Sequence, residues 1–384
     1  MQTRNSSYNK MFNRRIIVRS LFQKKLSRAE FARLTGLSRA AITMLADELI
    51  GEGVIRECGI DENSVVGRNP SLLEIVPDCY RILSVDIARD GCSVGVVSFG
   101  GEVLAAQRVP VAAEASPQEI VEQICAILKH LTDTVGEAPI LGFGITTPGP
   151  VDTTHGRVDD IPDFALWSRF SIVDEFKKHV DYDITFERDA NAVSLAELYF
   201  GYGRQCDDFM VVLSYTGVGL GVVKNRRLYS GKFGLTPELG HVTVDMNGGT
   251  CICGNRGCLH DYYGVNIILR QVRRDFPQVT GWPEIVDRAY DGEQYFINVV
   301  DRSARVLSIG VIDAVNLFAI DTVIVSGFNT YRPDMFLEAL QGYVRTSHIA
   351  RNFYDVNVYG TQMQKYENLV GAAAGVIEKN LNIH

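Results

Sequence analysis

The chain has 384 residues, of which 46% are hydrophobic and 22% are charged, and its formal net charge at pH 7 is −8. This composition is typical of a globular protein with two or three domains, and it excludes a disordered or fibrous chain. The charge is uneven, because residues 1–75 hold 12 lysines and arginines against 8 aspartates and glutamates, whereas the remainder holds 26 against 38. A basic segment on an acidic protein favours contact between that segment and a polyanion.

The sequence has no stretch typical of a targeting signal or a membrane span. The N-terminus lacks an apolar signal-peptide core. The most apolar long stretch, residues 306–325, is interrupted by Asp313, Asn316 and Asp321. Five of the eight cysteines are scattered, as reduced thiols of cytosolic proteins are. We therefore expect a cytoplasmic protein that does not enter a membrane.

The N-terminal segment has the pattern of three consecutive helices. Apolar spacing predicts a helix over residues 9–25. Ser27 and Glu30 then form a capping box at the start of a second helix, and Gly36 is suited to the left-handed turn that ends it. Ser38 is expected to cap a third helix. Helix, glycine turn and helix together predict a helix–turn–helix motif.

In such a motif the start of the second helix contacts base edges in the DNA major groove. The residues expected on that surface are Ser38, Arg39, Ala40 and Thr43. Strands at 54–57 and 71–75 then predict a hairpin whose tip, a wing, places Arg68 at a phosphate or in the minor groove. The pattern predicts a winged-helix DNA-binding domain; the alternative is a small helical interaction module with an ordinary basic surface.

From residue 80 onward, short β-rich runs alternate with helical patterns, which predicts an α/β body. The expected strands are 82–87, 92–97, 102–105, 140–145, 184–187, 210–214, 221–224 and 323–327, and the expected helices are 117–134, 189–199 and 368–379. The glycine-rich residues 216–221 are expected to form a loop between two of these strands. Loops after strand C-termini are where such folds bind ligands.

Four residues have the spacing of a metal site, H-x9-C-x-C-x4-C: His241, Cys251, Cys253 and Cys258. One imidazole and three thiolates suit a closed, tetrahedral, structural Zn²⁺ site. Glycines between the last two cysteines let the backbone turn tightly enough to aim both sulfurs at one point. The alternative is a group of buried free cysteines, which pack as small hydrophobic residues. Three cysteines within eight residues favour zinc.

The residues around this cluster resemble the signature of the ROK family (repressors, open reading frames, sugar kinases), in which E-x-G-H and C-x-C-G-x-x-G-C-x-E join a sugar pocket to a zinc. The matching residues are Glu238, Gly240, His241, Cys251, Cys253, Gly254, Gly257 and Cys258. The last position departs from the pattern, since His260 stands where the family usually has glutamate. The N-terminal segment also resembles that of the repressors of this family.

The resemblance implies an α/β fold with an N-terminal winged helix–turn–helix and a two-lobed, actin-like (ribonuclease-H-like) body. The expected domains are the DNA-binding domain at 1–76, a first lobe at 77–188 plus 366–384, and a second lobe at 189–365. The second lobe is expected to hold the zinc site and an oligomerisation surface. A ligand cleft is expected between the lobes.

The kinase chemistry of the family is expected to be lost. The first phosphate loop of its kinases, Asp-x-Gly-Gly-Thr, ends here in Ala88, Arg89 and Asp90. These residues put side chains where backbone must approach phosphate, and Asp90 would repel a triphosphate. Tyr215 stands where the second loop usually begins with glycine. Asp189 matches the kinase base but is expected to serve as a helix N-cap and ligand contact in a protein that is not an enzyme.

By the same resemblance, the sugar pocket falls on Gly149, Asp163, Arg188, Asp189, Glu238, His241 and His260. Arg188 and Asp163 replace asparagines of the family pattern. Arg188 and His260 shift the pocket toward cationic donors, which predicts an acidic or phosphorylated sugar, or another small acid, as effector. The alternative is that Arg188 forms an internal salt bridge, to Asp163 or near Glu187, in a vestigial pocket.

These patterns together predict a transcriptional regulator, a repressor of carbohydrate-related genes. It is expected to bind a double-stranded DNA operator as a homodimer or homotetramer and to respond to a small sugar-like effector in the inter-lobe cleft. Two other classes stay open: a sugar kinase with a fused DNA-binding domain, and a regulator controlled by a protein partner.

Overall fold

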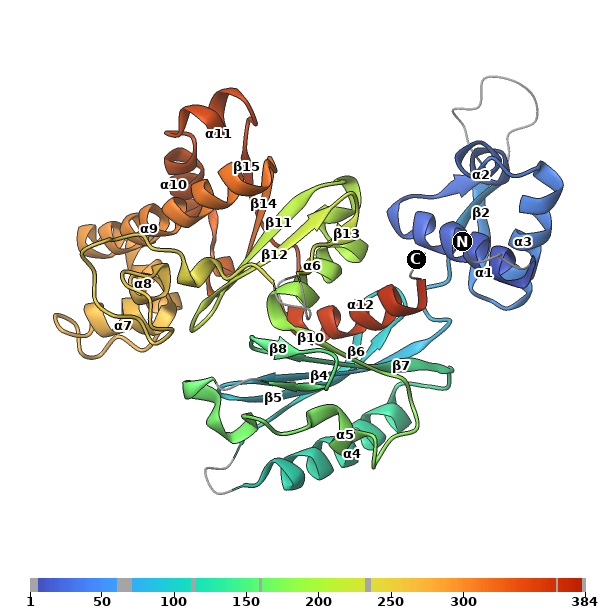
Figure 1. Cartoon of the computed structure of the whole chain (residues 1–384), viewed down its shortest axis with the longest axis horizontal. Coiled ribbons are helices and arrows are strands. Elements are labelled where there is room, and N and C mark those ends of the chain that lie inside the picture. The colour runs from blue at the N-terminus through green and yellow to red at the C-terminus, as the bar shows by residue number, and fades with distance from the viewer. Residues whose placement is uncertain are drawn as a thin grey trace. The chain divides into compact units, whose positions relative to one another are not determined.

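The computed structural model describes residues 6–60, 71–111, 115–158, 161–231, 236–363 and 365–381. The chain divides into two compact units, which Figure 1 shows with their elements labelled. The first unit comprises Met1–Thr147, Phe170–Glu187 and Asn368–His384, and the second comprises Pro148–Arg169 and Arg188–Glu367. Within the described ranges, every helix is too short or too polar to span a bilayer. The finer division into three domains stays a prediction.

The N-terminal segment of the first unit contains three helices and a small sheet. They are α1 (Ser6–Gln23), α2 (Arg28–Thr35), α3 (Arg39–Gly51), β1 (Leu26–Ser27), β2 (Ile55–Ile60) and β3 (Ser71–Ile75), with strand order β1-β3-β2. The capping box is confirmed, because Ser27 and Glu30 each accept a hydrogen bond from the other's amide. Gly36 is left-handed, with a φ of 70°, and ends α2. The expected helices and paired strands are therefore confirmed.

This N-terminal segment packs against the rest of the first unit. Phe22 at the end of α1 meets Phe99 edge to face, with ring centroids 5.1 Å apart. Arg19 of α1 also pairs with Glu378 at 3.1 Å, and both side chains are largely buried. An exposed pair contributes about 0–1 kcal/mol, and in a largely buried pair the stronger attraction is offset by the cost of desolvation. The N-terminal helices are thus held by an apolar contact and an ion pair.

The main sheet of the first unit has the strand order β10-β7-β4-β5-β6. Its strands are β4 (Arg81–Ala88), β5 (Gly91–Ser98), β6 (Val103–Val109), β7 (Ile140–Thr147) and β10 (Ile184–Arg188). Helix α12 (Glu367–Leu381) lies along one face, and α4 (Pro117–Thr134) and α5 (Ile172–Phe176) lie along the other (Figure 1). Gly144 permits this packing, because a Cβ there would lie 2.1 Å from the carbonyl oxygen of Ala372.

The second unit is built on a sheet of order β13-β12-β11-β14-β15. Its strands are β11 (Phe209–Ser214), β12 (Val218–Lys224), β13 (Arg227–Leu228), β14 (Thr322–Gly327) and β15 (Asn357–Gly360), beside a small pair, β8 (Val151–Asp152) and β9 (Arg157–Val158). Its helices are α6 (Asp189–Phe200), α7 (Val265–Val272), α8 (Trp282–Tyr290), α9 (Gln294–Phe318), α10 (Asp334–Val344) and α11 (His348–Asn352). Apolar residues of α7 to α10 and of the three central strands form one buried core.

The loop expected at residues 216–221 is wrong, because β12 already begins at Val218. Its glycines serve helix packing: a Cβ at Gly221 would lie 1.9 Å from the Ser194 hydroxyl oxygen of α6. A Cβ at Gly219 would likewise lie 2.9 Å from Cβ of Ala190. A glycine in a strand often marks such a close approach, so these two residues are explained without a phosphate ligand.

Helix α6 also buries an ionisable group, Glu197. Its carboxylate accepts a hydrogen bond from the Tyr202 amide at 2.8 Å and another from the Thr361 hydroxyl. Burial raises the pKa of Glu197 from its ordinary 4.5 to about 7. Between these two pH values the folded protein keeps a proton that the unfolded chain releases, so the free energy of unfolding should fall as pH rises.

Glu197→Gln is therefore expected to remove that slope and to stabilise the protein at pH 8 by on the order of 2–3 kcal/mol. At pH 4.5, where Glu197 is protonated in the fold, the variant should match the wild type. Urea unfolding at both pH values measures this, with Glu338→Gln, an exposed position on α10, as the matched control. Equal pH slopes in the two variants would contradict the assignment.

Candidate functional site

The start of α3 is exposed and carries the positive charge of Arg39. Ser38, Arg39, Ala40 and Thr43 are all exposed there. The Ser38 hydroxyl oxygen accepts a hydrogen bond from the Ala41 amide at 3.2 Å, which fixes the first turn. Among the described residues, Arg39 has no hydrogen-bond or ion-pair partner. The guanidinium of Arg39 is thus available to an outside anion.

The acidic residues farther along α3 are neutralised within the N-terminal segment. Asp47 pairs with Arg28 of α2 at 2.8 Å, and Glu48 pairs with Lys10 of α1 at 2.7 Å. These pairs leave Arg39 as the charge presented at the exposed end of the helix. The expected wing residue Arg68 lies outside the described residues.

A second candidate centre is the cluster of His241, Cys251, Cys253 and Cys258, whose ligand atoms all lie within 4.8 Å of one another. The Cys251 sulfur is 3.7 Å from Nδ1 of His241, and the Cys253 and Cys258 sulfurs are also 3.7 Å apart. A tetrahedral zinc with Zn–S bonds of about 2.3 Å requires sulfurs about 3.8 Å apart. The donor set and its spacing therefore fit zinc.

The loop that carries the three cysteines depends on two left-handed glycines. Gly254 has a φ of 88° and Gly257 a φ of 61°. A Cβ at Gly257 would lie 1.7 Å from the carbonyl oxygen of Asp245, so no other residue fits there. Glycine adopts this backbone conformation without steric cost. The two glycines let the chain reverse between Cys253 and Cys258.

Arg188 is the centre of a third cluster and is 6% exposed. Its Nη2 lies 2.9 Å from a Glu238 carboxylate oxygen, and its Nη1 donates to the Thr236 hydroxyl oxygen and to the Pro237 carbonyl oxygen. Its Nε is 3.9 Å from the Asp189 carboxylate. Burial raises the pKa of Glu238, and the charge of Arg188 opposes that rise. The internal salt bridge considered from the sequence is thus present, with Glu238 as partner.

Two other expected pocket residues contact this cluster. A Cβ at Gly149 would lie 2.7 Å from Cδ and Nε of Arg188, so glycine makes room for the arginine. Asp189 is the first residue of α6 and accepts a hydrogen bond from the Ala190 amide at 2.7 Å. The N-cap position belongs to Arg188, so the N-cap role expected for Asp189 is wrong by one residue. Sequence reasoning missed Thr236 and Pro237, whose only signal was their place beside Glu238.

The cluster of His241 and the three cysteines lies beside His260, the last of the expected pocket residues. The rings of His241 and His260 are 6.0 Å apart between centroids. His260 also lies over Gly217, where a Cβ would be 3.5 Å from its Nδ1. The side chain of Asp163 lies outside the described part of the chain. His260 is therefore placed beside the turn that precedes β12.

The residues at the phosphate-loop positions are engaged by other side chains. In the first unit, Asp90 pairs with Arg108 of β6 at 2.6 Å. In the second unit, the Tyr215 hydroxyl donates to the buried carboxylate of Glu367 at 2.6 Å, and Ser326 donates to its other oxygen at 2.6 Å. Burial raises the pKa of Glu367 above its ordinary value. The Tyr215 hydroxyl thus donates to a neighbouring carboxylate of the same unit, although 41% of the residue is exposed.

Comparison with known proteins decides the family. The model of the ROK family matches residues 82–379. The chain belongs to the ROK family. Among ROK relatives, a putative xylose repressor of Caldicellulosiruptor is 26% identical over 98% of both chains. The glucokinase of Thermotoga maritima is 31% identical over 64% of this chain and 81% of its own.

The ROK fold is also found by comparison with solved structures. A ROK family transcriptional regulator, a homologue of the Escherichia coli Mlc protein, superposes with a TM-score of 0.80 at 23% identity. The match covers 97% of this chain and 96% of that one, so it includes the N-terminal helices. The expected α/β fold with a ROK body is confirmed.

Proposed function

We propose that this ROK protein is a sugar-responsive transcriptional repressor that binds operator DNA through the start of α3. The observation that carries the proposal is the exposed group Ser38, Arg39, Ala40 and Thr43, in which Arg39 has no partner among the described residues. The match to a xylose repressor along nearly the whole of both chains supports it. The proposed setting is the cytoplasm, where genomic operators are accessible.

The proposed DNA complex is a winged helix in the major groove. Arg39 reads a base edge or a phosphate, Thr43 lies one turn farther along α3, and Arg68 of the wing contacts the backbone or minor groove. A homodimer or homotetramer places two such helices on a palindromic site. The expected domains 1–76, 77–188 plus 366–384, and 189–365 are kept as part of this proposal.

Arg39→Ala tests the DNA interface. Because one base or phosphate contact is lost, operator affinity should fall by about 1–3 kcal/mol, and for a phosphate contact the salt slope should fall by about one. The matched control is Arg227→Ala, which removes the same charge from exposed strand β13 of the second unit. Fluorescence anisotropy at several salt concentrations measures both variants. Equal losses of operator affinity in the two variants would show that DNA binding depends on net charge alone, and not on a contact of Arg39.

The proposed effector is an acidic or phosphorylated sugar that binds at the cluster of Arg188, Glu238 and Asp189. The support is the buried guanidinium, which an acidic group of the ligand would bind in place of Glu238, beside two carboxylates that offer acceptors to hydroxyl groups. Gly149 borders the same cluster, and Asp163 and His260 are proposed to complete it. An effector of this class would shift the protein toward the conformation to which it binds more tightly.

We also propose that a structural Zn²⁺ ion, held by His241, Cys251, Cys253 and Cys258, stabilises the region next to the Arg188 cluster. Their spacing suits tetrahedral coordination with no open position, which is typical of structural rather than catalytic zinc. When bound, zinc would fix the His241 ring and the loop that leads to His260.

A second candidate function is a sugar kinase with a fused DNA-binding segment, because the Thermotoga maritima glucokinase is 31% identical. The Tyr215–Glu367 hydrogen bond argues against it, because it fixes a tyrosine side chain where the second phosphate loop of the kinases begins with glycine. We expect a coupled ADP-release assay with xylose, glucose and N-acetylglucosamine to stay at background. Sugar-dependent turnover would favour the kinase.

A further inference from the structure

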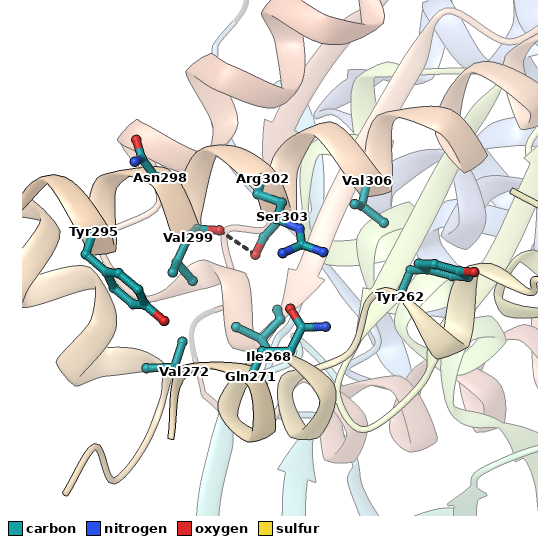
Figure 2. A pocket seen from close by; sticks show the side chains of 10 residues that line it. All are labelled: Tyr262, Ile268, Gln271, Val272, Tyr295, Asn298, Val299, Arg302, Ser303 and Val306. Carbon is teal, nitrogen blue, oxygen red and sulfur yellow. Dashed lines mark hydrogen bonds between the residues drawn. The ribbon is translucent and has the colours of Figure 1, made fainter. Parts of the chain in front are cut away.

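A pocket of about 250 Å³ lies between α7 and α9, within the second unit (Figure 2). Valine and isoleucine side chains from both helices form its apolar walls, including Ile268 of α7 and Val306 of α9. This volume is slightly below the ~300–1,000 Å³ that is typical of small-molecule sites. None of its lining residues belongs to the Arg188 cluster or to the metal-site ligands. The pocket is thus a separate site of metabolite size.

The charge in this pocket comes from Arg302 on α9. Figure 2 shows its guanidinium extending across the space toward the Gln271 amide on α7. Within the described part of the chain, neither side chain has a hydrogen-bond or ion-pair partner. The ten lining residues include no carboxylate. One cation and one amide therefore face the same space without a neutralising anion in its walls.

The tyrosine hydroxyls at the pocket are already engaged elsewhere. Tyr262 donates to Asp245 at 2.8 Å, and Tyr295 donates to Asp275 at 3.0 Å. The Ser303 hydroxyl donates to the Val299 carbonyl oxygen, one turn back in α9, at 2.8 Å (Figure 2). The polar groups left to recognise a ligand are the Arg302 guanidinium, the Gln271 amide and the NH2 group of Asn298, whose oxygen already accepts from Gln294. The apolar part of the wall consists of Ile268, Val272, Val299 and Val306.

We propose that this pocket binds a small organic acid with an apolar body. The carboxylate would be held by Arg302, whose planar fork matches a carboxylate in two parallel hydrogen bonds, and by the Gln271 amide. The apolar body would lie against Ile268 and Val306.

The probe for this site is 4-fluorobenzoate, observed through broadening of its fluorine NMR line in the presence of the full-length protein. 4-Fluorobenzyl alcohol has the same apolar body without the charge and should bind at least about tenfold more weakly. Arg302→Gln should also weaken 4-fluorobenzoate binding by about tenfold or more, because charge-assisted hydrogen bonds are lost. The matched control is Arg305→Gln, at an exposed arginine of the same helix that does not line the pocket.

Two further variants test where 4-fluorobenzoate binds. Arg188→Gln should leave 4-fluorobenzoate binding unchanged, since Arg188 lies outside this pocket, and this separates the proposal from that of the sugar effector. Val306→Phe narrows the pocket and should reduce binding without removing any charge. The proposal is overturned if 4-fluorobenzoate does not bind, if the alcohol binds equally well, or if Arg302→Gln and Arg305→Gln weaken binding to the same extent.

Discussion

Cys258→Ser is expected to abolish stoichiometric zinc binding and to lower the free energy of unfolding by several kcal/mol. Cys258 is completely buried, and its sulfur lies 3.7 Å from that of Cys253. Structural zinc contributes an apparent binding free energy of about 10–16 kcal/mol in small zinc domains, and that energy is folding energy. The larger second unit has its own apolar core, so the loss should weaken the protein without preventing folding.

The measurement is zinc content by atomic absorption, together with thermal unfolding with and without a chelator. The chelator should lower the unfolding temperature of the wild type and have no further effect on Cys258→Ser. Cys125→Ser, at a half-buried cysteine of α4 in the first unit, is the matched control and should keep its zinc. A wild-type protein that contains no zinc, or whose stability is indifferent to the chelator, would contradict the zinc assignment.

Arg188→Gln is expected to have the second-largest effect, a loss of about 2–3 kcal/mol of unfolding free energy. Breaking a buried ion pair by removing one partner costs about 3–5 kcal/mol. The lower figure is expected here because the Glu238 side chain is 38% exposed and water offsets part of its lost partner. The variant should also lose any thermal stabilisation by sugar acids and sugar phosphates that the wild type shows.

A double-mutant cycle with Glu238→Gln separates the pair from its surroundings. The coupling energy between positions 188 and 238 is expected at about 1–2 kcal/mol, within the range for residues in contact. Thermal-shift measurements with galacturonate, glucose 6-phosphate and xylose test the effector class. A coupling energy near zero would show that the Arg188–Glu238 ion pair does not stabilise the protein. Stabilisation of the wild type by xylose alone would replace the acidic effector with a neutral one.

The features that the sequence predicted well are those fixed by neighbours along the chain. The capping box of Ser27 and Glu30 and the left-handed Gly36 involve residues within one or two turns of one another, so their residue types are sufficient to place α2. The four residues expected to bind a metal were likewise grouped from their spacing, and the fold brings their possible ligand atoms within 4.8 Å of one another.

The features that the sequence did not predict depend on distant parts of the chain. Gly219 was expected in a loop, but it lies in β12, where its lack of a side chain makes room for Ala190 of α6. The partner of Arg188 is 50 residues away, so no local pattern indicates it. Helices α7 and α9 were not predicted, and therefore neither was the pocket between them.

Operator binding through α3 is tested by selection of genomic fragments of the source organism with the purified full-length protein, followed by titration of an enriched fragment. We expect binding at least about 10³-fold tighter than to random DNA of the same length. We also expect affinity to fall with rising salt, and Arg39→Ala to weaken the specific complex. Failure to enrich any fragment, or an enriched fragment that Arg39→Ala binds as well as the wild type does, would contradict a repressor that reads DNA through α3.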